Sequence, residues 1–536
     1  MKSYVSDLLK LASHLLRDVH ARCLASDSLE LLHDLKTLCN RTEQEGLSFL
    51  TITLPSFSSD LEQSLEIGQI VPSAFRGFGK SGRIPSFLRG IVGQLFDRST
   101  GLLLCNKEVP PNAQQRLCLG SIRQLCLFLK KVEVECSPER TSRALLQFRE
   151  TEQELVCFEV HDDDVGRFKS IARLIWDPVV SRLEIDDMVP RHGPGTTVEG
   201  LTGNSKYRLQ SWHERLEEFL PFLGSALSVR ADDSEEFSRT TFVPPDQELP
   251  CKVTPVPKTL KSPRIIAIEP CCNQYGQQAI RSQLYAAIEL DRLAAGHVNF
   301  RDQTVNQRLA LESSSDRRYS TIDLSDASDR VYLSLALSMF DVNPLVRDFI
   351  VACRSRYASF PGGQVIGPLV KFASMGNALT FPVEAMYFYT ICVVALTSEI
   401  VGPVTLSDVS KASKMVFVYG DDIIVPTRYA RLVVDYLRKY NLKVSATKCF
   451  IEGNFRESCG VDAFWGTDVT PVYLRSTIPT TRKQSSKIIS IVETAHQLVT
   501  AGWYGLADSL YLIAERILGG KLPTVNERSS VIGRLR

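Results

Sequence analysis

Two adjacent acidic residues, Asp421 and Asp422, stand between two short apolar runs, residues 415–418 and 423–425. Two strand-like runs joined by a turn that contains Gly420 predict a β-hairpin with both carboxylates at its tip. Adjacent carboxylates repel each other, so we expect a cation beside them. Their oxygen atoms are the ligands that Mg²⁺ and Mn²⁺ prefer. For this motif alone a solvated turn is the alternative, because Asp is a favoured turn residue.

A third carboxylate, Asp323, lies near the end of a strand-like run over residues 319–324, ahead of a helix predicted over 331–340. If this strand and the hairpin belong to one antiparallel sheet, Asp323 meets Asp421 and Asp422. Three carboxylates can hold two divalent ions, and two ions about 3.5–4 Å apart stabilise the attacking and leaving oxygens of a phosphoryl displacement. The pattern therefore predicts nucleotidyl transfer. A capped helix start after Asp323 is the simpler alternative.

A polar segment suited to a sugar precedes an apolar helix that is predicted near residues 381–396. The segment contains Ser374, Gly376 and Asn377. A Ser and an Asn in that place can contact a ribose hydroxyl, which a purely structural loop does not need. The segment is therefore a candidate for sugar recognition, with a structural loop as the alternative.

A basic segment of strand and turn character spans residues 256–266 and carries Lys258, Lys261 and Arg264. Ammonium and guanidinium groups neutralise phosphate charge, and guanidinium groups also form paired hydrogen bonds to phosphate oxygens. The segment is a candidate for contacting a triphosphate. The alternative is a basic face that only meets water.

The composition sets the broad class of the molecule. With 536 residues, of which 44% are hydrophobic, the chain can bury a core that offsets chain entropy, so an intrinsically disordered protein is excluded. The length exceeds the roughly 250–300 residues of a single core, which predicts two or three subdomains. A formal net charge of +1 excludes a polycation that coats nucleic acid indiscriminately. Nine Lys and Arg against four acidic residues from Arg475 onward predict a basic surface there.

Neither a membrane span nor a disulfide framework is expected. The longest uncharged apolar segment, residues 385–398, is shorter than the ~20 residues that cross a bilayer. The N-terminal stretch lacks the pattern of a signal peptide. The 14 cysteines are scattered without a C-x-x-C pair, so they are predicted to be reduced and buried. These features favour a soluble protein of a reducing cytosol.

Taken in order, these motifs resemble a known family. The segment from Val256 to Arg475, a little over two-fifths of the chain, carries the motif series of the RNA-dependent RNA polymerases of single-stranded RNA bacteriophages, the replicase beta subunits of the Qβ type. Besides the segments above, the series includes residues 267–270, 302–308, 445–450, 455–460 and 468–471. A single short motif is weak evidence, whereas this ordered series is specific.

The resemblance implies an α+β fold of the right-hand polymerase type, with fingers, palm and thumb and an antiparallel palm sheet backed by helices. On this basis residues 1–240 are a helical N-terminal region with part of the fingers, and residues 241–318 are fingers with the basic NTP-contacting segment. Residues 319–475 are the palm with the catalytic motifs, including a finger insertion near 345–372. Residues 476–536 are a basic C-terminal thumb region.

The resemblance also implies roles in catalysis. Asp323, Asp421 and Asp422 would bind two Mg²⁺ ions, for which Mn²⁺ is a substitute. These ions would activate the 3′-hydroxyl that attacks the α-phosphate of the incoming NTP. Lys448 would protonate the departing pyrophosphate as a general acid.

The implied nucleotide contacts form two sets. The triphosphate set is Lys258, Lys261 and Arg264. The sugar set, in chain order, is Ser328, Asp329, Ser374, Gly376 and Asn377. The resemblance leaves open which of Ser328, Asp329 and Asn377 contacts the ribose 2′-hydroxyl, because the second acid follows Asp323 by six residues rather than by the five of many viral RNA polymerases.

The activity implied by the resemblance is template-directed RNA synthesis in viral genome replication and transcription. The substrates would be a single-stranded RNA template and NTPs, with release of pyrophosphate. The implied partners are the host translation elongation factors Tu and Ts and a ribosomal protein that aids template choice, with no membrane. The implied location is the cytoplasm of the infected bacterial host.

Other functions fit part of the sequence. A reverse transcriptase also uses a Tyr-x-Asp-Asp hairpin, but such enzymes resemble one another in an aromatic residue soon after the first catalytic Asp, and residues 324–329 contain none. A non-catalytic RNA-binding protein with a polymerase fold is the second rival, which the presence of all three acids disfavours. A P-loop at Gly79 lacks its first glycine, because Ala74 stands in that place.

Overall fold

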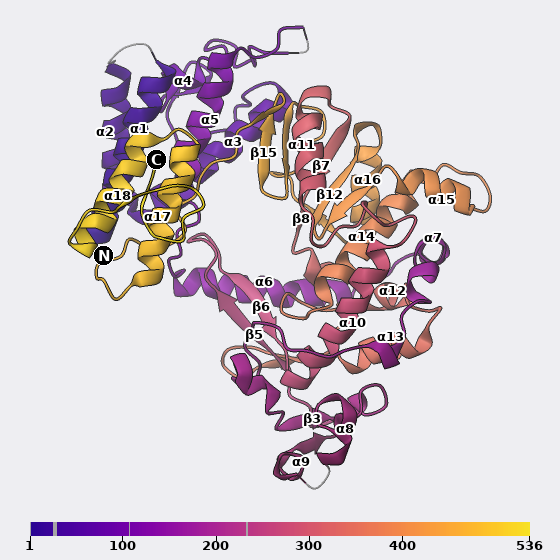
Figure 1. The fold of residues 1–536 in the computed structure, drawn as a ribbon. Coiled ribbons are helices and arrows are strands. Elements are labelled where there is room, and N and C mark those ends of the chain that lie inside the picture. The colour runs from indigo at the N-terminus through magenta and orange to yellow at the C-terminus, as the bar shows by residue number, and fades with distance from the viewer. Residues whose placement is uncertain (1, 25–28, 107, 232–233) are drawn as a thin grey trace.

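The computed structural model describes residues 2–24, 29–106, 108–231 and 234–536 (Figure 1). Helices alternate with short strands throughout these ranges, so the predicted α+β class is confirmed. The buried apolar side chains of the described residues gather in two large cores and one small one.

One large core joins the two ends of the chain. Apolar residues recur every three or four positions along α1 (Lys2–Cys23), which buries Leu8, Leu11 and Leu15 in this core. Figure 1 shows the N-terminal helices (indigo) beside the C-terminal helices (yellow). The other elements of this region are α2 (Leu29–Glu45), a π-helical turn (Phe49–Thr53), α3 (Leu54–Ile67), β1 (Lys80–Ser81), β2 (Ile84–Pro85), α4 (Arg89–Val92), α5 (Ala113–Leu127), α17 (Ser485–Thr500), α18 (Tyr504–Leu518), β17 (Thr524–Val525) and β18 (Arg534–Leu535).

The second large core surrounds a central antiparallel sheet with strand order β11-β12-β7. Its strands are β7 (Tyr319–Ile322), β11 (Phe417–Tyr419) and β12 (Asp422–Pro426). The almost wholly buried helix α14 (Thr380–Leu396) contacts β11, and α16 (Thr427–Lys439) contacts β7 and β12. The predicted antiparallel sheet backed by helices is therefore confirmed.

A smaller three-stranded sheet lies beside the central one, in the order β14-β15-β16. Helix α11 (Thr304–Asp316) contacts both this sheet and strand β7, so it joins the two (Figure 1). The strands are β14 (Phe455–Ser458), β15 (Val461–Phe464) and β16 (Thr467–Asp468), and next to them β8 (Leu324–Ser325) pairs with β13 (Lys443–Val444).

The small core lies under a separate sheet with the order β10-β9-β5-β6. Strands β5 (Cys251–Val256) and β6 (Arg264–Ile268) form a long antiparallel hairpin, and helix α6 (Pro138–Val156) contacts both. Short strands β9 (Ala358–Ser359) and β10 (Val365–Ile366) extend the sheet. The basic segment predicted to contact phosphate is the tip of this hairpin.

The remaining elements cover these sheets. The longer helices are α7 (Asp162–Val180), α10 (Cys271–Glu289), α13 (Pro344–Ala352) and α15 (Leu406–Ser413). The shorter elements are 3-10 turns at Ile185–Asp187, Gly203–Tyr207, Glu214–Leu216, Val229–Ala231 and Ser328–Arg330, strands β3 (Ser211–His213) and β4 (Thr241–Val243), and helices α8 (Phe222–Ser225), α9 (Glu235–Arg239) and α12 (Leu333–Ser338).

The segment after Asp323 differs from its prediction. The strand predicted over 319–324 ends at Ile322, and the helix predicted over 331–340 begins only at Leu333. The reason is that Tyr332 is extended and forms a β-bridge with Lys371. Tertiary pairing thus overrides helical periodicity where the chain leaves the candidate site.

The apolar helix is buried as predicted, whereas the prediction of buried thiols holds for most of the cysteines and not for all of them. All 14 cysteines lie in the described ranges as free thiols, and nine of them are buried. The apolar segment 385–398 lies mainly in the buried helix α14. None of the described helices combines the length and the apolarity that crossing a membrane requires.

Candidate active site

Strand register places Asp323 beside the hairpin tip. Ile322, the last residue of β7, pairs with Ile423 of β12. Because the strands are antiparallel, Asp323, which follows β7, and Asp422, which begins β12, lie at the same end of the sheet. Asp421 is close enough to raise the pKa of both carboxyl groups. The structure therefore brings the three predicted carboxylates into one cluster.

The turn at Gly420 holds the tip in one conformation. Its φ is +60°, in the left-handed region that favours glycine, and a Cβ added there would overlap the ring of Phe381. The Phe381 ring packs edge-on against Tyr419, with 5.2 Å between ring centroids. A larger residue at position 420 would therefore displace Asp421.

Burial makes the charged forms of two of these carboxyl groups unfavourable. Burial, reinforced by the neighbouring acids, raises the pKa of Asp422 to about 7. Burial also raises the pKa of Asp323. Asp421 is exposed at the tip. A bound cation would stabilise the charged, deprotonated forms of these carboxyl groups.

Lys448 lies directly on this cluster. Its ammonium group donates a hydrogen bond to Asp323 Oδ2 at 2.8 Å and lies 3.4 Å from Glu457 Oε1. Although burial acts in the opposite direction, Glu457 and Asp323 raise the pKa of Lys448 well above its usual value. Lys448 is thus a cation held between two carboxylates.

The turn between β14 and β15 holds Asp422. The Cys459 N–H donates to Asp422 Oδ2 at 3.2 Å, and the Ser458 hydroxyl lies 3.4 Å from Asp422 Oδ1. The backbone oxygen of Asp422 accepts from the side-chain amide of Asn306 at 3.4 Å. The β14–β15 turn therefore sets the direction of the Asp422 carboxylate, although the turn is distant from Asp422 in the sequence.

The donor chemistry of the cluster fits a hard divalent cation, because all its ligands would be carboxylate oxygens. Within the described ranges, no group of three or more His, Cys, Asp or Glu side chains, this cluster included, is arranged so that it could hold a metal ion as it stands. Asp323 faces Lys448 and Asp422 faces the 458–459 turn, whereas Asp421 is exposed. An ion bound at Asp323 Oδ1 would leave the hydrogen bond from Lys448 to Oδ2 intact, whereas both oxygens of Asp422 already accept contacts from the 458–459 turn.

The raised pKa of Asp422 predicts a pH effect on stability without divalent ions. An unfolded Asp titrates near 3.9, whereas Asp422 titrates near 7 in the folded chain. The folded protein therefore binds the extra proton between these values and loses stability as pH rises from about 4 to 7. We expect Asp422→Asn to raise the unfolding free energy at pH 8 by a few kcal/mol, at about 1.4 kcal/mol per pKa unit, and much less at pH 4.5.

Denaturant unfolding of wild type and Asp422→Asn in EDTA at the two pH values measures this difference. The exposed neighbour supplies the control, since Asp421→Asn should change stability little at either pH. A gain of the same size for Asp422→Asn at pH 4.5 and at pH 8 would contradict the titration.

Two of the predicted sugar-contacting residues touch each other. Asp329 lies in the 3-10 turn Ser328–Arg330, and its Oδ1 accepts a hydrogen bond from the Ser374 hydroxyl at 2.8 Å. The same oxygen accepts from the ammonium of Lys371 at 2.9 Å. Ser328, the preceding residue, is buried.

The side-chain amide of Asn377 forms hydrogen bonds within the protein. Its amide nitrogen donates to the buried carboxylate of Glu269 at 3.1 Å, and its amide oxygen accepts from the Leu379 N–H at 2.8 Å. Gly376 has a φ of +125°, and a Cβ there would overlap the carbonyl of Ala267. Gly376 therefore allows this loop to lie against strand β6.

The predicted triphosphate set lies at the tip of the β5–β6 hairpin. Lys258, Lys261 and Arg264 are all exposed. Burial of its ammonium and the charge of Arg264 lower the pKa of Lys258, whereas Asp421 and Asp323 raise it. Lys258 is thus near the carboxylate cluster, and Arg264 is near Lys258.

Sequence analysis missed three charged residues around the site. Glu457 contacts Lys448, and Lys371 contacts Asp329. Glu384 lies buried on α14, where burial and the charges of Asp421 and Asp329 raise its pKa well above the usual value. The visible signals were the lone Glu384 beside an apolar helical run and the place of Glu457 within the motif segment 455–460. Lys371 has no such signal, because it acts through contacts between distant segments.

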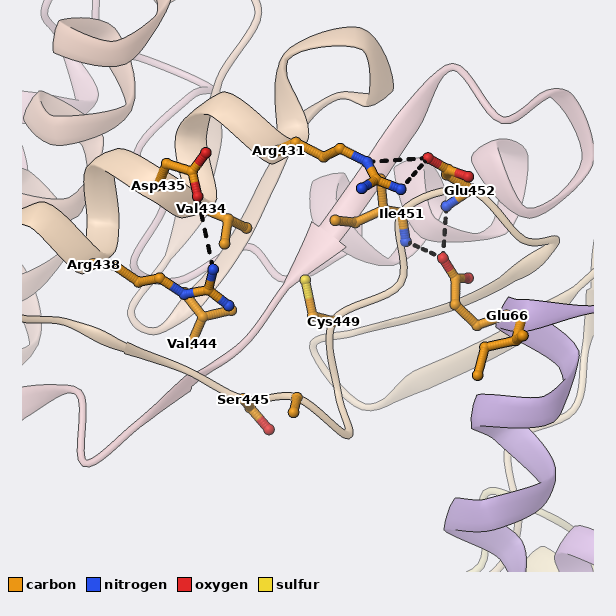
Figure 2. Close-up of a pocket in the computed structure, with 12 residues that line it drawn as sticks. Glu66, Arg431, Val434, Asp435, Arg438, Val444, Ser445, Cys449, Ile451 and Glu452 are labelled. Atoms are coloured by element: carbon orange, nitrogen blue, oxygen red, sulfur yellow. Dashed lines mark hydrogen bonds and ion pairs between the residues drawn. The ribbon is translucent and has the colours of Figure 1, made fainter. Parts of the chain in front are cut away.

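A cavity of about 590 Å³ lies against the loop that carries Lys448. Figure 2 shows side chains from α3, α16 and residues 444–452 around it, with the Arg431–Glu452 ion pair among them. Glu66 of α3 accepts the N–H groups of residues 451–453, which ties this loop to the N-terminal region. None of the predicted site residues lines the cavity, so it is separate from the carboxylate cluster.

Residues 246–492 match the family model described as RNA replicase, beta-chain. The RNA-directed RNA polymerase subunit beta of Enterobacteria phage SP is 37% identical over 227 residues, which are 42% of this chain and 36% of that protein. The same subunit of Escherichia virus Qbeta is 34% identical over 273 residues, which are 51% of this chain and 43% of that protein. This chain thus covers less than half the length of these relatives.

A solved structure is also similar. The RNA-dependent RNA polymerase of a human picorbirnavirus matches with a TM-score of 0.36 and 11% identity, over 50% of this chain and 55% of that chain. The resemblance to replicase beta chains that the motif series predicts is confirmed by the sequence matches over residues 246–492.

Proposed function

We propose that this chain, a replicase beta-chain over residues 246–492, is an RNA-directed RNA polymerase that copies a single-stranded RNA template from NTPs and releases pyrophosphate. The observation that carries the proposal is the strand register that sets Asp323 beside Asp421 and Asp422 at one end of the central sheet. A carboxylate cluster of this kind, beside basic side chains, suits nucleotidyl transfer.

Divalent ions supply the charge that stabilises the reacting phosphate oxygens. Asp323, Asp421 and Asp422 would hold them, and we propose Mg²⁺ as the ion, with Mn²⁺ as a substitute. The protein would bind the triphosphate with Lys258 and Arg264, and the position of Lys258 near the carboxylates supports this role.

Lys448 would hold the proton that the departing pyrophosphate needs. Its contacts with Asp323 and Glu457 keep it protonated, and a nearby polyphosphate would replace these carboxylates as its partner. Lys261, which is exposed in the same hairpin turn as Lys258, would add charge attraction for the triphosphate.

The regions of the chain would correspond to the parts of a right-handed polymerase. We assign the palm to residues 319–475, fingers to 241–318 with the insertion near 345–372, and the thumb to 476–536. Residues 1–240 would supply the N-terminal region and part of the fingers. The core that the first helices share with α17 and α18 supports one unit made of both chain ends.

The replicase relationship suggests how the protein would work in its host. We propose that it acts in the cytoplasm of an infected bacterium, with the host elongation factors Tu and Ts and a ribosomal protein as partners. Its basic C-terminal region would hold RNA through phosphate contacts, which are sensitive to salt and largely blind to sequence.

Incorporation of labelled NTPs on a single-stranded RNA template tests the proposal. We expect a template-dependent RNA product that requires Mg²⁺ or Mn²⁺ and disappears in EDTA. Reactions with and without the elongation factors show whether these partners are needed. A product from dNTPs at the NTP rate would point instead to reverse transcription, and RNA binding without a product, with the factors present, would point to a non-catalytic protein.

A further inference from the structure

A lysine beside the candidate site is fully buried between two carboxylates. The side chain of Lys371 has 0% exposure, and its ammonium lies 2.9 Å from Asp329 Oδ1 and 3.7 Å from Glu152 Oε2. The ring centroid of Phe148 is 3.5 Å from the same nitrogen. Taking an ammonium out of water costs free energy that only close partners offset. The positions of this lysine and its two carboxylates are therefore fixed together.

The contact with Lys371 fixes the direction of the Asp329 carboxylate. Asp329 Oδ1 accepts both from Lys371 and from the Ser374 hydroxyl at 2.8 Å. Its second oxygen, Oδ2, has no hydrogen bond to another residue in the part of the chain that the structure describes, and 17% of the side chain is exposed. Asp329 thus presents one oriented acceptor to a ligand.

The free oxygen of Asp329 lies near the carboxylate cluster. Asp329 follows Asp323 by six residues, and helix α14 contacts both the 3-10 turn that carries Asp329 and strand β11, whose hairpin carries Asp421. A nucleotide whose α-phosphate lies at Asp323 and Asp421 carries its ribose next to that phosphate. A fixed hydroxyl acceptor beside the cluster suits the sugar rather than the base or the outer phosphates.

The other candidate for contacting the sugar, Asn377, already uses both ends of its side-chain amide in hydrogen bonds within the protein. Asn377 uses its nitrogen on Glu269 and its oxygen on the Leu379 N–H. Turning it toward a ribose would break both hydrogen bonds and leave the buried Glu269 with one partner fewer. This comparison favours Asp329 as the acceptor.

We propose that Lys371 is a positioning residue for ribose recognition: with Glu152 and Ser374 it holds Asp329 so that Asp329 Oδ2 accepts a hydrogen bond from the 2′-hydroxyl of the incoming NTP. The proposal rests on the proposed polymerase function. It also ties sugar selection to helix α6, which contributes Glu152 and Phe148.

The test compares ATP, 2′-dATP and 3′-dATP as substrates for single-nucleotide addition on a primed RNA template. For Lys371→Met we expect the ratio of kcat/KM for ATP to that for 2′-dATP to fall at least about tenfold, because a hydrogen bond to a charged group is lost or misdirected. The ratio for ATP to 3′-dATP should stay the same. Lys371→Arg should restore part of the 2′ selectivity.

Two variants separate positioning from general damage. Arg330→Met breaks a second contact to α6, the ion pair of the buried Arg330 with the exposed Glu154 at 2.6 Å, without removing a contact of Asp329. It should retain the wild-type sugar selectivity. If Lys371 acts through Asp329, adding Lys371→Met to Asp329→Ala should change the 2′ selectivity no further.

Folding is checked by thermal unfolding of each variant. Should Lys371→Met alone prove too unstable, the double variant with Glu152→Met removes the unpaired buried carboxylate and still frees Asp329. Unchanged 2′ selectivity in a folded Lys371 variant, or a loss that Arg330→Met shares, would overturn the inference. No template-directed product from the wild-type protein would overturn the proposed function and this inference with it.

Discussion

Asp421→Asn should abolish RNA synthesis while the protein stays folded. The exposed Asp421 carboxylate is the member of the cluster without a structural partner among the described residues, so the amide removes charge and leaves packing unchanged. Loss of one carboxylate removes several kcal/mol of charge stabilisation in the transition state. At 1.36 kcal/mol per tenfold, we expect a loss of about 10³-fold or more in kcat.

Single-nucleotide addition with saturating NTP measures this loss, and template binding and thermal unfolding serve as parallel readouts. Asp435→Asn is the matched control, because Asp435 is an exposed aspartate on α16 away from the cluster, and among the described residues its ion-pair partner is Arg438 at 3.7 Å. Near-normal turnover of the Asp421 variant would refute the assignment of the cluster.

Arg123→Met should cost the protein about 3–5 kcal/mol of stability. The buried Arg123 guanidinium on α5 forms ion pairs with Glu62 of α3 and with Asp462 of β15. Its Nε also donates to the Val469 carbonyl at 3.2 Å. Methionine fills much of the same space but leaves two buried carboxylates facing each other without a cation, and removing one partner of such a cluster is costly.

The shift of the denaturation midpoint measures this cost. Arg431→Met is the matched control, since the Arg431–Glu452 pair is 77% and 62% exposed and should contribute little to stability. Replacing Glu62 and Asp462 by Gln and Asn in the Arg123→Met background should recover part of the loss. Equal midpoints for the Arg123 and Arg431 variants would show that this buried triad contributes little to stability.

The carboxylate cluster could be predicted because its determinants are local. Apolar runs on both sides of Gly420 specify the hairpin, and the run before Asp323 specifies the neighbouring strand. Antiparallel pairing of these strands then leaves little freedom for where the acids lie. The helix after Asp323 was predicted too long because periodicity carries no information about the bridge from Tyr332 to Lys371.

The charged contacts that support the site could not be read from the sequence. Arg123 and Asp462 are 339 residues apart, and Lys371 meets Asp329 and Glu152 from three separate segments. A single buried Lys or Arg has no sequence pattern of its own, since its partners are chosen by the packing of distant elements. The engagement of Asn377 by Glu269, 108 residues away, is hidden for the same reason.

The core that joins the two ends of the chain bears on how the protein is made. The apolar face of α1 leaves the ribosome long before α18, which covers part of it, has been translated. The N-terminal helices therefore expose part of their apolar surface while the central sheet is synthesised. This core can form completely only after α18 has been translated. Premature termination before α17 would leave apolar surface exposed at the opposite end of the sequence, so shortened chains should aggregate through their first helices.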